Sequence, residues 1–277
     1  MRINTNTAAI NAQRNLYNTE MKLSKSLERL SSGLRVNRAG DDAAGLAISE
    51  NLKSDIRALE QSSRNAADGI SVIQTAEGAL DEVNGILIRM RELAQQAANE
   101  TLGASERGYL NTEFQALSNE ITRISDTTQF NGTYLLNASV TGTLDIQVGL
   151  GNTATDRIGI DLTGDRDATG LGINASVLTG ADNTTALASI ATVEAAISTV
   201  SSDRADLGAA QNRLESTIRS IGNAVENLSA ANSRIRDVDI AAETSAMTSA
   251  QILQQAGVAV LSQANMTPQT ALMLLQG

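Results

Sequence analysis

Two adjacent carboxylates, Asp41 and Asp42, come closest to a chemically active group in this sequence. A carboxylate pair can perform acid–base catalysis or bind a cation. No third ligand and no histidine lies near the pair, and an apolar helical pattern restarts at Ala43. Aspartate is a favoured helix N-cap because its side chain accepts a hydrogen bond from a free backbone N–H. We therefore expect these residues to cap a helix and to place charge.

The composition removes most other sources of chemistry. The chain has no Cys and no His, so it lacks the usual ligands of zinc, haem and iron–sulfur clusters and can form no disulfide. The glycine-rich segments GLGN and TGLGIN lack the spacing of a phosphate-binding loop. The remaining acidic residues are spread along expected helix faces, which disfavours a carboxylate-based hydrolase. We predict that the protein is not an enzyme and binds no cofactor or metal.

The charge distribution suggests an assembly whose two ends meet specific neighbours. The net charge of −10 argues against nucleic acid as a partner. Residues 1–40 carry seven basic side chains, whereas no basic residue follows Arg236 and no charged residue follows Glu243. No segment resembles a cleaved signal peptide or has the apolar length needed to cross a bilayer. We expect no membrane insertion, and export would require a route other than the general secretory signal.

Aliphatic residues at heptad spacing predict long helices. Helices are expected at 42–99, 105–128 and 184–230, with one more at each end of the chain. The single proline, Pro268, and the scarcity of aromatic residues favour long helices joined by aliphatic seams. The strongest pattern covers residues 42–99, where apolar residues are seven apart: Leu52, Leu59, Ala66, Ile73, Leu80 and Leu87.

Alternating apolar residues predict a β-hairpin at about 140–165, and Asn131-Gly132 is a turn signal before it. Because short links between long helices imply antiparallel neighbours, the chain should go out and come back. The predicted fold is mainly α: a rod of long antiparallel helices in a coiled-coil-like bundle, with a small β-hairpin and the termini paired at one end. The alternating strand residues are Leu144, Ile146 and Val148, followed by Ile158, Ile160 and Leu162.

Three segments resemble bacterial flagellins. They are LERLSSGLRVNRAGDDAAGLAISE at 27–50, TQFNG at 128–132 and NRLESTIRSIGNAVENLSAANSRIRDVDIAAE at 212–243. Flagellins usually carry variable outer domains after the hairpin, but the stretch between Leu162 and Thr184 is too short to hold them. The chain is therefore similar to a short flagellin that lacks those domains.

The resemblance implies a structural subunit that self-assembles into the bacterial flagellar filament for swimming motility. It implies export of the unfolded chain by the flagellar type III apparatus and an extracellular location. Residues 1–40 and 235–277 would be the terminal helices of an inner-tube domain, and 41–234 a rod domain. Implied partners are other copies in a helical homopolymer, the flagellar cap and hook-junction proteins, and an export chaperone that binds the C-terminal segment. We expect inner-tube packing from Leu16, Leu23, Leu30, Ile252, Leu253, Val260, Met266 and Met273.

A second surface role follows from the segment IRMRELAQQ at 88–96. It resembles the segment by which many flagellins engage the vertebrate Toll-like receptor that senses them. The corresponding positions are Arg89, Leu93 and Glu113. Arg89 and Leu93 are four apart, so they share one helix face and can touch one patch. The same residues could instead pack neighbouring subunits, and both interpretations stay open here.

Two other protein classes share parts of this pattern. A hook–filament junction protein of the flagellum has similar termini, but typically has proline after the paired aspartates, where this chain has Ala43-Ala44-Gly45. The short length and the C-terminal match also favour flagellin. An unrelated coiled-coil scaffold would explain the heptads but neither the motifs nor the uncharged tail.

Overall fold

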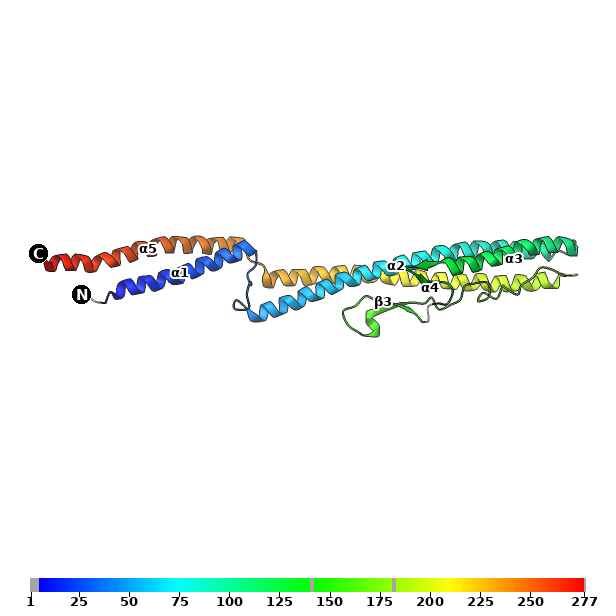
Figure 1. Ribbon diagram of the computed structural model, residues 1–277, viewed down its shortest axis with the longest axis horizontal. Helices are drawn as coiled ribbons and strands as arrows, with labels where there is room; N and C mark the ends of the chain where they lie inside the picture. The colour runs from blue at the N-terminus through cyan, green and yellow to red at the C-terminus, as the bar shows by residue number, and fades with distance from the viewer. Residues whose placement is uncertain (1–4, 140–141, 181–182, 277) are drawn as a thin grey trace. The chain divides into compact units, whose positions relative to one another are not determined.

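The computed structural model describes residues 5–139, 142–180 and 183–276, with side-chain exposure described as far as residue 267. The long helices predicted from the heptads are present, and the mainly α fold is confirmed (Figure 1). The helices are α1 (Thr7–Ser32), α2 (Ala43–Ala97), α3 (Ala104–Thr127), α4 (Thr184–Arg236) and α5 (Ile240–Gln276). The strands are β1 (Gln129–Phe130), β2 (Thr133–Tyr134), β3 (Leu144–Gln147) and β4 (Arg157–Ile160), with a short 3-10 turn, Ala154–Asp156, before β4.

Local capping sets the boundary between α1 and α2. Gly33 ends α1 with φ of 72°, a left-handed conformation that glycine adopts without steric cost, and its N–H donates to the Arg29 carbonyl at 2.9 Å. Asp42 begins α2 by accepting a hydrogen bond from the Gly45 N–H at 2.8 Å. The Asp42 cap was expected from the sequence, and glycine is the residue type that most often ends a helix in this left-handed conformation. Helix α4 runs on to Arg236, beyond the predicted end at 230, because no glycine or proline interrupts SAANSRIR.

The chain forms two compact units. One contains the residues up to Ile56 and from Glu226 onward, and the other is Arg57–Val225. The divisions fall inside α2 and α4, because both helices pass from one unit to the other. The domain limits expected at 41 and 234 concern positions in an assembled filament, and they stay a prediction.

The first unit is built on α1 and α5, which pack along each other in antiparallel directions (Figure 1). The Asn6 side-chain amide donates to the Ala264 carbonyl at 2.7 Å, and Arg29 pairs with Glu243 at 3.4 Å. At the other end of the pair, the Arg35 N–H donates to the Arg236 carbonyl at 2.6 Å and the Val238 N–H to the Gly33 carbonyl at 3.1 Å. The ends of the described chain therefore lie side by side, as predicted.

The second unit has an aliphatic core between α2, α3, α4 and the hairpin. Helices α2 and α4 are antiparallel, since Asp81 pairs with Arg204 and Arg91 with Glu194. Strands β3 and β4 pair antiparallel with Ile146 opposite Ile158. Fully buried side chains in this core include Ile73, Leu80, Leu87, Met90, Leu93, Phe114, Ile121, Val193, Val200 and Leu214.

The hairpin region differs from the prediction in two ways. The β3 and β4 strands are shorter than expected. Val148 and Leu162, which were predicted as strand residues, are buried but lie just outside the strands. A second, very short hairpin, β1–β2, was not predicted as strands. It turns through Asn131 and Gly132 with φ of 48° and 82°, the left-handed pair that an Asn-Gly turn supplies. In the described part of the chain, no helix has the length and hydropathy needed to cross a membrane.

Candidate functional site

The outward faces of α1 and α5 carry many exposed apolar side chains. A pair of helices buries only the stripe along which the two touch, so apolar residues elsewhere on either helix remain in contact with solvent. Soluble monomers rarely expose contiguous apolar surface of this kind, and such surface marks a contact with another molecule. The exposed residues are Ile10, Tyr17, Met21 and Leu27 on α1, and Ile240, Ile252, Leu253, Val258, Val260 and Met266 on α5.

The predicted inner-tube residues divide into two groups. Leu16, Leu23 and Leu30 on α1 are half-buried, and Leu16 lies against Gly257 of α5, where an added Cβ would approach its Cδ1 to 3.3 Å. The heptad seam of α1 therefore serves the helix pair itself, at least in part. Ile252 and Leu253 on α5 are 62% and 59% exposed, and Val260 and Met266 are also exposed. The side chain of Met273 lies beyond the described ones.

The two aspartates singled out in the sequence have separate roles in the first unit. Asp42 is the N-cap of α2, whereas the Asp41 carboxylate pairs with Lys25 Nζ at 2.7 Å and accepts from the backbone N–H groups of Asn37 and Arg38. The hydrogen bond from Lys25, followed by the one from the Arg38 N–H, lowers the pKa of Asp41 to about 2. The predicted capping and charge placement are confirmed. Within the described ranges, no three acidic side chains gather closely enough to hold a metal ion.

Arg89 joins α2 to α3 at the surface of the second unit. Its Nε and Nη2 donate to Glu113 Oε1 at 3.0 and 2.9 Å, and its Nη1 donates to Glu92 Oε2 at 2.9 Å. The hydrogen bond to Glu113 is the main cause that raises the pKa of Arg89 above its usual value. The Arg89 side chain is 50% exposed, so part of the guanidinium remains available to a partner.

Leu93 corrects one sequence expectation. It was placed beside Arg89 as a surface contact, but its side chain is only 1% exposed and belongs to the aliphatic core. Spacing of four residues puts both side chains on one helix face, but the flexible Arg89 reaches outward from the seam while the shorter Leu93 stays inside it. Leu93 can support this surface but cannot touch a partner while the unit is folded.

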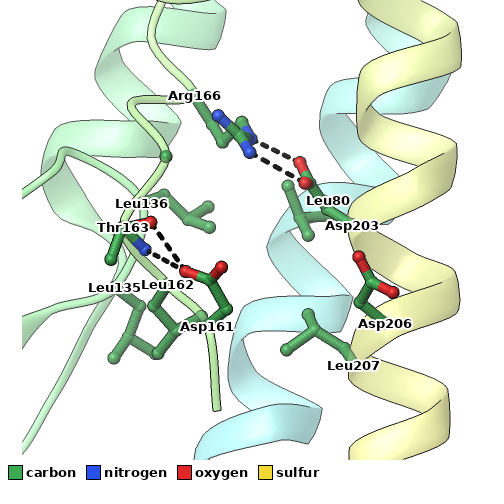
Figure 2. A pocket seen from close by; sticks show the side chains of 11 residues that line it. Leu80, Leu135, Leu136, Asp161, Leu162, Thr163, Arg166, Asp203, Asp206 and Leu207 are labelled. Carbon is green, nitrogen blue, oxygen red and sulfur yellow. Dashed lines mark hydrogen bonds and ion pairs between the residues drawn. The ribbon is translucent and has the colours of Figure 1, made fainter. Parts of the chain in front are cut away.

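A small cavity of about 100 Å³ lies between α4 and the segment that follows the hairpin (Figure 2). Arg166 forms a two-point ion pair with Asp203 of α4, with one contact at 2.8 Å, and Asp161 accepts from the N–H and hydroxyl of Thr163. Leu80, Leu162 and Leu207 also line the cavity. The hydrogen bond from the Thr163 hydroxyl is the first cause that lowers the pKa of Asp161, so this group stays ionised. The arrangement fastens the segment to α4, and the sequence analysis missed it.

Comparison with known proteins matches both ends of the chain to one family. Residues 3–141 match the bacterial flagellin N-terminal helical region, and residues 190–275 match the bacterial flagellin C-terminal helical region. The chain is 52% identical over 277 residues to a flagellin of Halalkalibacterium halodurans, with 100% of both chains covered.

Two solved structures are similar to this chain. The crystal structure of Bacillus cereus flagellin is 31% identical with a TM-score of 0.50, covering 57% of this chain and 88% of that one. A structure described as a flagellar hook-associated protein from Vibrio parahaemolyticus has a TM-score of 0.57, covering 71% of this chain and 100% of that one. Its identity of 15% shows a shared fold alone.

Proposed function

The chain belongs to the bacterial flagellin family, whose members are structural proteins and not enzymes, and from that premise we propose how it forms a filament. The single observation that carries the proposal is the exposed apolar surface on α1 and α5. These helices pair with each other and still leave large side chains in solvent, so neighbouring copies can bury them. Residues 1–40 and 235–277 would then form the inner tube, and 41–234 the outer part.

The free energy gained by burying these side chains is of the same size as the cost of association. Burying one large aliphatic side chain completely is worth about 1.5–3 kcal/mol, so covering one that is already half-buried contributes roughly 1 kcal/mol. Ten such side chains contribute on the order of 10 kcal/mol per subunit before the entropic cost of association is subtracted. The exposed part of α5 carries no charge after Glu243, so no charged group has to be desolvated with it.

Substitutions on α5 test this proposal without disturbing the monomer. Ile252→Ser combined with Leu253→Ser should raise the critical concentration for polymerisation by tenfold or more, measured by sedimentation and electron microscopy. Leu187→Ser, at an exposed apolar residue of α4 in the second unit, is the matched control and should change it little. Wild-type filament formation by the double-serine variant would contradict the proposal.

We also propose the route and the partners of the subunit. The chain would be exported unfolded through the flagellar type III apparatus and join an extracellular filament, with the cap and hook-junction proteins at its ends. Before export, an export chaperone that covers the uncharged, apolar C-terminal segment would prevent early polymerisation. This part is supported by the family and by the exposed side chains of α5.

A receptor role is proposed for the surface around Arg89 and Glu113. The half-exposed guanidinium and the neighbouring carboxylate are the groups a flagellin-sensing Toll-like receptor could contact, with Leu93 acting from the core beneath them. The alternative role, a hook–filament junction protein, is not favoured. The full-length identity of 52% is to a flagellin, whereas the likeness to a hook-associated structure is one of fold.

A further inference from the structure

The second unit contains an open groove whose charge is opposite to that of the unit around it. Residues 57–225 contain 21 acidic and 11 basic side chains, so the whole net charge of −10 lies in this unit. The groove, of about 530 Å³, lies between α2, the β3–β4 hairpin and α4. Its apolar floor is Leu59, Val148, Ile158 and Ile221, and it is also lined by Arg157 of β4 and Arg213 of α4. No carboxylate is among the described residues that line it.

Neither of the two arginines forms an ion pair among the described residues. Arg157 donates to the side-chain amides of Asn152 and Gln147. The carboxylate next to Arg157 in the sequence, Asp156, accepts hydrogen bonds from Thr153 and also interacts electrostatically with Arg157. On α4, the positions three and four residues from Arg213 are alanine, serine and threonine. Two exposed guanidiniums without a carboxylate hydrogen-bond partner among the described residues, next to an apolar floor, form a site for an apolar side chain flanked by carboxylates.

The same unit presents such a side chain on α3. Tyr109 is 77% exposed, more than any other large apolar side chain among the described residues. Glu106 and Glu113 lie three residues before it and four after it, so all three share one helix face. Glu106 forms no ion pair in the described structure, while Glu113 pairs with Arg89. An exposed aromatic residue between two carboxylates matches the groove in both polarity and charge.

We propose that the groove of one subunit receives the α3 face of a second copy. The Tyr109 ring would lie on the apolar floor, and the carboxylates of Glu106 and Glu113 would lie beside Arg157 and Arg213. This inference rests on the proposed polymerisation and names a further contact for it, separate from α1 and α5. Because groove and face belong to different parts of the unit, the contact is head-to-tail and propagates from copy to copy.

Charge reversal in the full-length chain tests the contact. Arg157→Glu combined with Arg213→Glu should raise the critical concentration for polymerisation by tenfold or more at low salt, and Tyr109→Ala should also raise it. Adding Glu106→Lys to the groove variant should recover part of the loss, since the charges are then opposite again. Arg64→Glu with Arg219→Glu, two exposed arginines outside the groove, is the control with the same charge change and should assemble far better. Thermal melting of each monomer verifies that it is folded.

The outcomes separate this contact from the proposed function. If the groove variant polymerises as readily as its control, the groove is not an assembly surface. If it loses assembly but Glu106→Lys restores nothing, the α3 face is not the occupant. In both cases the wild-type chain still polymerises. Failure of the wild type to polymerise would instead overturn the proposed function itself.

Discussion

At the residue scale, Asp41 makes the stability of the first unit depend on pH. Its pKa in the folded chain is about 2, below the usual value of 3.8, because the folded state holds the carboxylate beside Lys25 and two backbone N–H groups. A lowered pKa means that the stabilisation is complete above about 4 and is lost as the pH falls through about 2. Acidification across this window should therefore weaken the contact between α1 and the start of α2.

Asp41→Asn tests this pH dependence. The variant should melt at a lower temperature than the wild type at pH 7, because the amide cannot pair with Lys25, and the difference should vanish as the pH approaches 2. Circular dichroism melting between pH 7 and pH 2 measures both effects. Asp55→Asn serves as the control. Asp55 belongs to the same unit, and its carboxylate forms no ion pair in the described structure. A constant difference at every pH would show that Asp41 acts through something other than its charge.

Arg89 and Leu93 should behave differently despite their spacing. Arg89→Ala should lower receptor signalling in a reporter-cell assay while changing the melting temperature little, because exposed ion pairs contribute at most about 1 kcal/mol. Leu93→Ala removes a fully buried side chain and should destabilise the second unit by about 2–5 kcal/mol. Any loss of signalling by that variant should follow its loss of folding. Arg123→Ala is the matched control for Arg89, since Arg123 is another exposed arginine, and it pairs with Glu120 three residues earlier.

At the element scale, one buried arginine holds the turn between α2 and α3. Arg107 is 2% exposed, and its guanidinium donates to the carbonyls of Ala97 at 2.9 Å and of Asn99 and Gly180 at 3.4 Å. Ala97 is the last residue of α2, so the positive charge lies where the helix dipole favours a cation. The hydrogen bonds from Arg107 to these three carbonyls connect the end of α2, the turn and the segment before α4.

Arg107→Ala should therefore destabilise the second unit by about 3–5 kcal/mol, since it leaves buried carbonyls unpaired and opens a cavity. Urea unfolding followed by circular dichroism measures the change. Arg107→Lys should recover only part of the stability, because an ammonium cannot reproduce the planar fork that reaches three carbonyls. If Arg107→Ala unfolds like the wild type, the packed helices alone determine the turn.

At the scale of the whole molecule, the C-terminal segment can be removed by truncation without cutting into the second unit. Ending the chain after Glu243 removes most of α5 and with it the partner of α1, but leaves residues 57–225 complete. The truncated protein should remain soluble with a folded second unit, and it should form no filaments by electron microscopy. Filaments as abundant as those of the full chain would show that α5 is not the assembly element.

The sequence by itself determined the helices, their caps and the family. Heptads of leucine and isoleucine placed α2 within a few residues, and Gly33 and Asp42 marked the ends of neighbouring helices. These features depend on residues within one or two helical turns, since periodicity and capping are local. The motifs at 27–50, 128–132 and 212–243 were sufficient to identify a bacterial flagellin, which the full-length match confirms.

Only the tertiary structure decided which residues of each helix face are covered. Leu93 and Arg89 lie four residues apart on one helix face, yet Leu93 is buried and Arg89 is half-exposed. Arg166 and Asp203 are 37 residues apart, and Arg157 and Arg213 meet at one groove from a strand and a helix. Burial and long-range pairing depend on which other element packs against a face, and periodicity within one helix carries no record of that neighbour.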